Sequence, residues 1–234
     1  LSPGLGMFSY TEGLYLLPDG RLGVTSDVDR PWIIARDSLQ AVTPVGRRDA
    51  WLPMLADNAG EVMGSLFAGY NNSHVLYTDH EKGEAFLVNY RLKQPKGEHP
   101  VTLIRWDGYH DFESWIVVDT NGVEIEIKQS VHELVFTRDY ILLADTAFVA
   151  GTEMFTPWKN AKLPHDKTVV HIIDRRDLIS GKKTVISKQV VVNNPCIHLI
   201  PEYENPNDQI TVYMLHTPAT NTAEILRSYD RDLN

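Results

Sequence analysis

The chain has 234 residues, 43% of them hydrophobic and 23% charged, which is enough apolar sequence to bury a sizeable core and too much for a disordered chain. Its net charge is -9 and its Lys and Arg residues form no cluster, so nucleic acid has no electrostatic reason to bind. Cys196 is the single cysteine and cannot form an internal disulfide, which favours a reducing compartment such as the cytoplasm.

The sequence contains no signal peptide and no run of about 18 apolar residues. A peripheral contact with a membrane stays open, because the apolar patches that mediate such docking are not visible in a sequence. The chain begins at Leu1 and ends at Asn234 without a terminal signature. We therefore expect residues 1–234 to be a single, incomplete domain from the middle of a longer protein.

Short β-type runs separated by turn residues fill the first part of the chain. Pro18-Asp19-Gly20 favours a turn and has apolar runs on both sides, so we predict a hairpin there. Pro31 suits only the start or the edge of a strand. Residues 47–69 are less periodic and are expected to form a long connection. The predicted strands of this part are 13–17, 21–25 and 40–44, with a further strand inside 26–35.

The middle of the chain predicts a meander of strands. Val123 to Ile127 alternates apolar and polar residues with a period of two, and Asn121-Gly122 before it is a strong hairpin signal. Glu124 and Glu126 are therefore predicted to lie on the solvent-exposed face of a strand. An exposed loop is expected at 92–100. The predicted strands here are 85–90, 101–106, 114–119 and 123–127.

The last part continues the pattern, with a loop predicted at 151–167 and one weak helix at 220–228. Its strands are expected at 140–144, 168–173, 184–192 and 210–215. About a dozen short strands with regular turn signals and almost no helix predict an all-β fold.

Three histidines stand before the same arrangement of a turn and a strand. His132 precedes an apolar run, the turn 137–139 and the strand 140–144. His74 precedes the turn 79–83 and the strand 85–90, and His198 precedes the turn 205–208 and the strand 210–215.

The spacing of these histidines favours a propeller over a sandwich. His74 and His132 are 58 residues apart, and His132 and His198 are 66 apart. A propeller blade takes about 40 to 50 residues, so each interval fits one blade and an insertion. Equivalent positions on successive blades converge near the axis, where the three imidazoles would meet at one metal. The alternative is that nine histidines fall before turns by chance.

The stretch SVHELVFTRDYILLAD, from Ser130 to Asp145, resembles the second iron-ligand motif of the carotenoid cleavage oxygenases. That family includes apocarotenoid- and stilbene-cleaving enzymes and the retinoid isomerase of the visual cycle. Weaker matches flank the stretch in the expected order. They are residues 26–32 and 37–39 for an acidic segment, His74 with Gly83-Glu84 for the first ligand, and residues 195–198 with Tyr203-Glu204 for the third.

The resemblance implies a seven-bladed β-propeller with a helical cap over one face, of which this chain would cover about four blades. In the family four histidines hold Fe(2+), and O2 cleaves a conjugated C=C bond of a carotenoid, apocarotenoid or related olefin into two carbonyl products. His74, His132 and His198 would be metal ligands, and Asp27 would be a carboxylate that orients one of them. The fourth ligand would lie beyond Asn234, so the chain by itself is expected to be inactive.

The partners that the resemblance implies are a small hydrophobic polyene and O2, and any membrane contact would involve the cap. The oligomeric state, the substrate and the bond that is cleaved are left open.

The sequence departs from the family pattern in four places. Val75 stands where a Pro usually follows the first ligand, and the Gly-Glu pair is one residue further away, which leaves His80 as an alternative ligand. Asp27 is shorter than the usual Glu. Cys196 precedes His198 where the family has paired histidines, and no fourth ligand is present.

Two other classes of function stay open: a propeller scaffold without a metal, and a propeller hydrolase with a different metal. The hydrolase would require carboxylate ligands near the axis, and the three motif positions offer only imidazoles. A nucleophile or zinc site at Cys196 and His198 is disfavoured, because no second Cys-His pair or orienting acid has useful spacing.

Overall fold

The computed structural model describes residues 13–26, 29–51, 72–73, 76–90, 100–147 and 166–216. In these ranges the chain forms strands, three short 3-10 helices and no α-helix, and none of the helices is long and apolar enough to cross a bilayer. The 3-10 helices are η2 (Arg48–Ala50), η5 (Arg175–Asp177) and η6 (Pro206–Asp208). The strands are β1 (Gly13–Leu16), β2 (Leu22–Ser26), β3 (Asp29–Ile34), β4 (Ala41–Pro44), β5 (Thr78–Asp79), β6 (Glu84–Asn89), β7 (Thr102–Trp106), β8 (Glu113–Val118), β9 (Ser130–Phe136), β10 (Tyr140–Thr146), β11 (Thr168–Asp174), β12 (Thr184–Val192), β13 (Cys196–Pro201) and β14 (Val212–His216).

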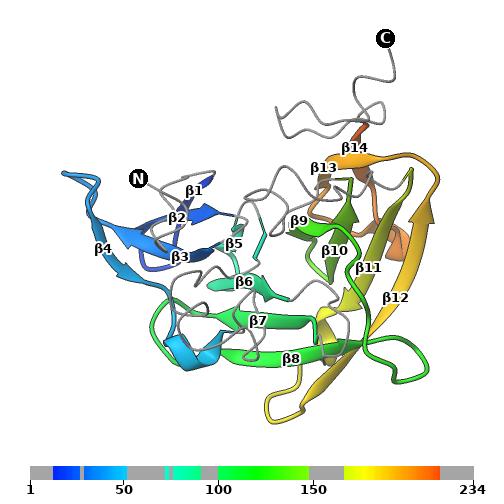
Figure 1. Cartoon of the computed structure of the whole chain (residues 1–234), viewed down its shortest axis with the longest axis horizontal. Helices are drawn as coiled ribbons and strands as arrows, with labels where there is room; N and C mark the ends of the chain where they lie inside the picture. Colours follow the sequence, from blue (N-terminus) through cyan, green and yellow to red (C-terminus); the bar gives the residue numbers. More distant parts are fainter. Residues whose placement is uncertain are drawn as a thin grey trace, which may run out of the picture.

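The strands form four antiparallel units that follow one another along the chain. β1 to β4 pair in sequence order, β5 to β8 and β9 to β12 do the same, and β13 pairs with β14. Figure 1 shows the units as an arc, with β5 and β9 toward its inside and β8 and β12 on its outside. Four-stranded antiparallel units arranged in this way are the blades of a β-propeller. The predicted all-β propeller architecture is therefore confirmed, and the described residues hold three blades and the first hairpin of a fourth.

The second and third blades share one continuous eight-stranded sheet. The first residues of β12 pair in parallel with β8, with Thr184 opposite Ile116 and Ile186 opposite Val118. The following residues of β12 pair in antiparallel fashion with β11. Hydrogen bonds between the two outer strands therefore join these blades, in addition to the packing of their faces.

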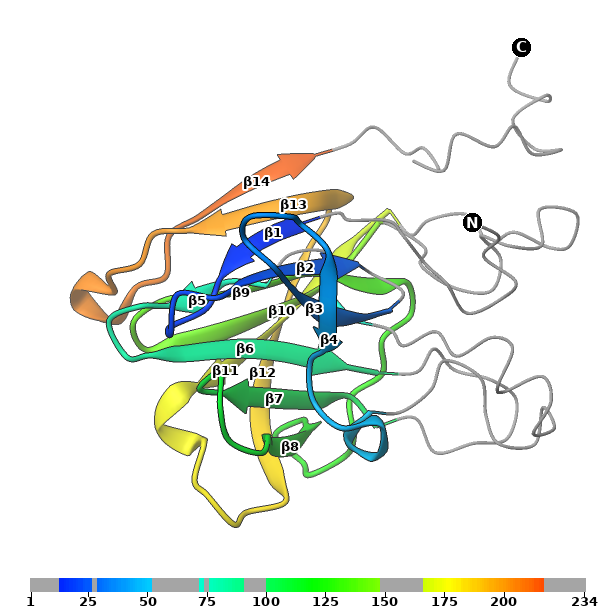
Figure 2. The same ribbon diagram turned by 90° about the vertical axis from the view of Figure 1, so that its left-hand side faces the viewer.

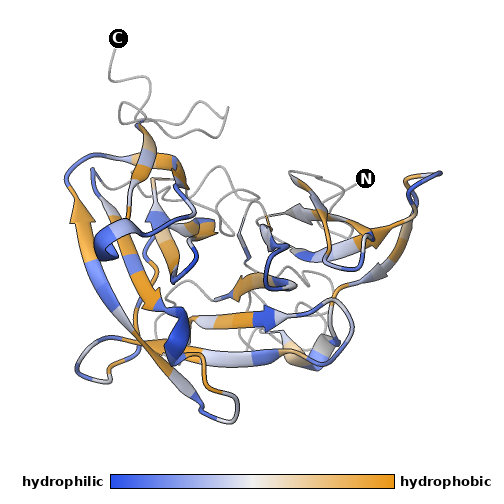
Figure 3. Cartoon of the chain, turned by 180° about the vertical axis from the view of Figure 1, so that it is seen from behind, coloured by the Kyte–Doolittle hydropathy of each residue, from blue (hydrophilic) through white to orange (hydrophobic). Residues whose placement is uncertain are grey.

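Apolar side chains fill the space between neighbouring blades. One cluster lies between the first and second blades, a larger one between the second and third, and a third between the third blade and the β13–β14 hairpin. Figure 3 shows the apolar residues spread along the strands of every unit. The largest fully buried side chains are Trp115, Tyr90, Phe86, Leu17, Leu76, Leu87, Leu103, Ile104, Ile127, Leu134, Ile141 and Leu142.

The position of a strand within its blade explains its sequence pattern. β9 and β10 contact apolar clusters on both faces, and six of the seven residues in each strand are buried. Such strands have continuous apolar runs instead of an alternating pattern. The outer strand β12 begins with alternating exposed and buried residues. From Lys188 to Val191 its residues are exposed on both faces.

Most of the predicted strands within the described residues are confirmed, and one is wrong. Residues 123–127 form no strand, and their only ladder contact is an isolated bridge between Glu124 and Val118. The turn before them is present, with Gly122 at a φ of +78° that a side chain would disfavour. Ile125 and Ile127 are buried, so the alternation of apolar and polar residues here reflects an irregular segment with one side buried. The helix predicted at 220–228 lies outside the described residues.

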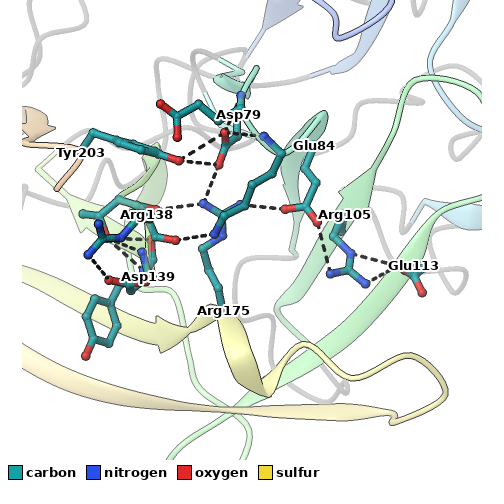
Figure 4. A network of polar contacts seen from close by, with 12 residues as sticks. Asp79, Glu84, Arg105, Glu113, Arg138, Asp139, Arg175 and Tyr203 are labelled. Carbon is teal, nitrogen blue, oxygen red and sulfur yellow. Dashed lines mark hydrogen bonds and ion pairs between the residues drawn. The ribbon is translucent and has the colours of Figure 1, made fainter. Parts of the chain in front are cut away.

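A buried arginine joins the ends of three units. Arg175, in η5 after β11, donates to Asp79 at 2.7 Å, to Glu84 at 2.7 Å and to the backbone oxygen of Thr137 at 2.9 Å. The hydroxyl of Tyr203, from the β13–β14 connection, also contacts Asp79 (Figure 4). We call these five residues the arginine cluster. It links the second blade, the third blade and the final hairpin.

The arginine cluster is shielded from water. The side chains of Arg175 and Asp79 are 5% and 1% exposed, and the guanidinium carbon lies 5.0 Å from the centre of the Phe86 ring. Burial raises the pKa of Asp79, but hydrogen bonds from Arg175 and from two backbone amides lower it by more. The pKa of Asp79 therefore lies below its usual value. Figure 2 shows η5 and η6, yellow and orange, on the same side of the strands, which is the side of the arginine cluster.

His171 in β11 is buried without a hydrogen-bond partner. Its side chain is opposite Leu143 and Gln189 in the ladder, and both ring nitrogens lack a partner among the described residues. Burial lowers the pKa of His171 to about 4. The imidazole is therefore neutral at pH 7 and packs as an apolar side chain.

Acid is expected to destabilise the chain through His171. The folded-state pKa of His171 is about 4, below the ordinary value of 6.5. The stability that comes from burying the neutral imidazole is therefore complete above pH 6.5 and is lost as the pH falls toward 4. At pH 4.5 the loss should be about 2 to 3 kcal/mol. Urea denaturation of the parent and of His171→Leu at pH 7 and pH 4.5 measures it. The variant should lose less stability than the parent, and equal losses would contradict this role for His171.

Candidate metal centre

His132 is the third residue of β9, the innermost strand of the third blade. The strand contacts apolar side chains on both faces, and His132 is only 4% exposed. Its imidazole nitrogens are potential metal ligands at the inner edge of the blade.

His198 lies in the equivalent place on the next unit. It is the third residue of β13, as His132 is the third residue of β9. The two rings have their centres 5.0 Å apart and are tilted by 52°. His198 is half-buried, so this side of the pair is accessible. These two imidazoles therefore lie side by side, and their role as metal ligands stays a prediction.

A β-bulge occurs at each of the two histidines. In the β9–β10 ladder Ala144 is opposite Glu133 and Asp145 is opposite Val131, so that His132 is the extra residue. The β13–β14 ladder also shifts register, but there the extra residue is Ile197, directly before His198. Bulges redirect side chains and are frequent beside functional sites. The irregularity in β9 allows His132 and its neighbour Glu133 to approach the same point.

The carboxylate of Glu133 completes the group. Its Oε1 atom lies 2.5 Å from Nδ1 of His198, and its side chain is 2% exposed. One potential ligand atom from each of His132, Glu133 and His198 lies within 4.8 Å of the others. Imidazole nitrogen and carboxylate oxygen are donors that suit Fe(II) and other first-row metals, so the residues present fit a metal ion.

Asp145 fixes the start of β9 and thereby places His132. Its carboxylate accepts hydrogen bonds from the backbone amides of Lys128, Gln129 and Ser130 at 2.8, 2.9 and 3.1 Å. Burial raises the pKa of Asp145 to about 6, against the opposite effect of these amides. At pH 7 the side chain is therefore a carboxylate that holds three consecutive amides.

Replacing Asp145 by Ala is expected to lower the free energy of unfolding by about 3 kcal/mol, because buried amides would lose a charged acceptor. The matched control is Asp119→Ala. Asp119 also accepts from the amides of Asn121 and Val123, but in an exposed turn where water can replace it. Urea denaturation of both variants tests this, and a loss at position 145 no larger than at 119 would contradict the assigned role.

Two of the residues predicted for the site cannot be placed. His74 and Asp27 lie outside the described residues, so their roles as ligand and as orienting carboxylate stay predictions. The alternative ligand His80 is exposed in the turn after β5, directly after Asp79 of the arginine cluster. It belongs to no group of potential metal ligands among the described residues.

Cys196 is a buried thiol beside the pair of histidines. Its Sγ donates to the backbone oxygen of His198 at 2.9 Å, and burial raises its pKa to about 11. A thiol in this state is a poor nucleophile and a poor metal ligand. The structure thus agrees with the sequence in disfavouring a cysteine site.

Glu133 was missed by the sequence analysis. The only signal available was a Glu inside a run of otherwise apolar residues, directly after a candidate ligand. In a regular strand consecutive side chains point to opposite faces, so Glu133 would be expected to point away from the site of His132. The bulge that overturns this expectation leaves no mark in the sequence.

No family model matches the sequence, and no curated protein is detectably similar to it. Solved structures, however, match the fold. A variant of Synechocystis apocarotenoid oxygenase superposes with a TM-score of 0.53 at 14% identity, covering 92% of this chain and 42% of that enzyme. A second variant of the same enzyme gives a TM-score of 0.51 at 15% identity over the same shares of both chains.

The chain has the fold of the carotenoid cleavage oxygenases. A lignostilbene dioxygenase from Pseudomonas brassicacearum also matches, with a TM-score of 0.47, 11% identity, and coverage of 79% of this chain and 33% of that enzyme. The chain therefore spans less than half the length of these relatives. At the 14 to 15% identity of the two apocarotenoid oxygenase variants the likeness establishes the fold, and the chemistry has to be argued from the site.

Proposed function

We propose that this chain is part of a non-haem Fe(II)-dependent oxygenase that uses O2 to cleave a conjugated C=C bond of a carotenoid, apocarotenoid or stilbene-like olefin. The observation that supports it is the convergence of His132 and His198, from equivalent places on successive units, with a buried carboxylate beside them. The fold that the chain shares with an apocarotenoid oxygenase supports the same proposal.

The residues of this chain would hold the metal and restrict its surroundings. His132 and His198 would each contribute an imidazole nitrogen, and the imidazole of His74 is expected as a third donor. When bound, Fe(II) would supply the redox chemistry that makes O2 reactive toward an electron-rich double bond. Cleavage of one C=C bond with both atoms of O2 gives two carbonyl products and leaves no oxidising equivalent over.

An apolar layer supports the site from within the blade. Val135, Leu142 and Ala144 of the third blade pack against Cys196 and Leu199 of the final hairpin. They hold β13 against β9 and keep water from that side of the two histidines. The half-buried face of His198 would then be the side open to the olefin and O2.

Product analysis under 18O2 tests the proposal. The full-length protein, reconstituted with Fe(II) without oxygen, is mixed with an apocarotenoid or a hydroxystilbene and then exposed to the labelled gas. We expect two carbonyl products, each carrying one labelled oxygen, and none from His198→Ala.

The matched control for this experiment is His110→Ala. His110 is exposed and pairs with Asp107, far from the candidate centre in the sequence and in the sheet order. It should cleave as the parent does. No cleavage by the iron-loaded parent, or equal cleavage by His198→Ala, would refute the proposed reaction.

A further inference from the structure

Glu133 is a buried carboxylate that contacts the ring of a candidate metal ligand from another blade. We propose that Glu133 is a positioning residue: it accepts a hydrogen bond from Nδ1 of His198 and thereby presents Nε2 of His198 to the metal. This inference rests on the proposed metal centre and extends it to a residue that the sequence motifs did not include.

The geometry of the contact supports this role. Oε1 of Glu133 lies 2.5 Å from Nδ1 of His198, which is a close hydrogen-bonding contact. A neutral imidazole with its proton on Nδ1 has its lone pair on Nε2. Because the carboxylate determines which nitrogen carries the proton, it also determines which nitrogen can bind a metal.

The backbone makes the contact possible. His132 is the extra residue of the bulge in β9, and this brings Glu133, the next residue, within reach of the same point. Glu133 is opposite Ala144, whose small side chain belongs to the apolar layer between the third blade and β13. The carboxylate therefore crosses the interface between two units and fixes His198 relative to His132.

Electrostatics supply a second argument. A carboxyl group with 2% exposure is costly to ionise unless cationic or hydrogen-bonding groups lie beside it. Neutral imidazoles leave the double positive charge of a bound metal uncompensated. A carboxylate that is one imidazole away from the metal balances part of this charge without occupying a coordination position that O2 or substrate could use.

Co(II) binding to the metal-free, full-length protein tests this role without relying on catalysis. The visible absorption of bound Co(II) reports both affinity and coordination. We expect Glu133→Ala to weaken Co(II) binding by roughly 10- to 100-fold, as the loss of other outer carboxylates does. Glu133→Gln should lose less Co(II) affinity than Glu133→Ala, because the amide oxygen of Gln can still accept a hydrogen bond from Nδ1 of His198. Glu124→Ala, at an exposed position outside the site, is the matched control and should bind like the parent.

A double-mutant cycle separates positioning from other roles. If Glu133 acts through His198, Glu133→Gln should weaken Co(II) binding in the parent and have no further effect in His198→Ala. This comparison also covers the case in which Glu133→Ala fails to fold, which far-UV circular dichroism would reveal.

The outcomes distinguish this inference from the proposed function. A parent that binds no Co(II) would remove the metal centre itself and the inference with it. A parent that binds, with Glu133→Gln and Glu133→Ala unchanged, would overturn the inference alone. Glu133→Ala and Glu133→Gln could instead weaken Co(II) binding strongly and equally, change the Co(II) spectrum, and have the same effect in the His198→Ala background. Glu133 would then be a direct ligand, which would overturn the positioning role.

Discussion

Replacing Arg175 by Met is expected to lower the free energy of unfolding by about 3 to 5 kcal/mol. The substitution keeps an unbranched aliphatic stem but leaves Asp79 buried without its cation, which is among the most destabilising single changes in proteins. The loss is a large fraction of the ~5 to 15 kcal/mol that stabilises a typical domain. The urea midpoint and slope of the parent and the variant measure it.

The neighbouring residue provides a matched control. Arg176, the next residue of η5, pairs with Asp174 at the end of β11, but the side chain of Arg176 is 80% exposed. Arg176→Met should therefore leave the urea midpoint almost unchanged. Adding Asp79→Asn to Arg175→Met should restore part of the lost stability, because the uncompensated charge is then removed. Equal midpoints for Arg175→Met and Arg176→Met would refute the structural role of the arginine cluster.

Replacing His132 by Ala is expected to abolish metal retention while the propeller stays folded. The loss of a residue that only hydrogen-bonds a metal ligand weakens metal binding by up to ~100-fold, and the loss of a ligand itself should weaken it by more. His132 lies at the interface of two units. As the extra residue of the bulge it is paired with no residue of β10, so the strands around it can persist. Equilibrium dialysis against Fe(II) under argon, with circular dichroism of the same samples, measures both properties.

His171→Leu is the control for this experiment. It also removes a buried imidazole, but from a place without a second potential ligand among the described residues. It should bind Fe(II) as the parent does. Loss of iron from both variants would indicate that the effect arises from general damage to the blade and would contradict a specific role for His132.

The strands could be predicted from the sequence because each strand leaves a local pattern. Inner strands such as β9 and β10 are continuous apolar runs between polar turns, and the turn at Gly122 requires a residue that tolerates a positive φ. The failure at 123–127 has a physical reason. Ile125 and Ile127 are buried with the same period as in a strand, but among the described residues the segment pairs with a strand only through the single bridge between Glu124 and Val118.

The pair of histidines could be predicted because a repeated architecture places equivalent residues side by side. His132 and His198 occupy the same position in β9 and β13, and the spacing along the chain reflects that repeat. The local context of His132, an apolar run followed by a polar turn, was the most informative part of the sequence. His74 and Asp27 lie outside the described residues and stay predictions.

Glu133 and Arg175 could not be predicted, because their roles depend on contacts between distant segments. Arg175 and Arg176 are adjacent and chemically identical, yet one is buried with Asp79 and the other is exposed. Only the packing of three units around η5 distinguishes them. In the same way, only the bulge in β9 brings Glu133 to His198.

The metal-binding role of His132 and His198 is the central claim, and anomalous X-ray diffraction tests it most directly. Crystals of the full-length protein loaded with Fe(II) would be measured on both sides of the iron absorption edge. We predict one strong anomalous peak within bonding distance of imidazole nitrogens of both His132 and His198, and no such peak for His132→Ala. Iron bound elsewhere, or no iron at this pair in the loaded parent, would contradict the account.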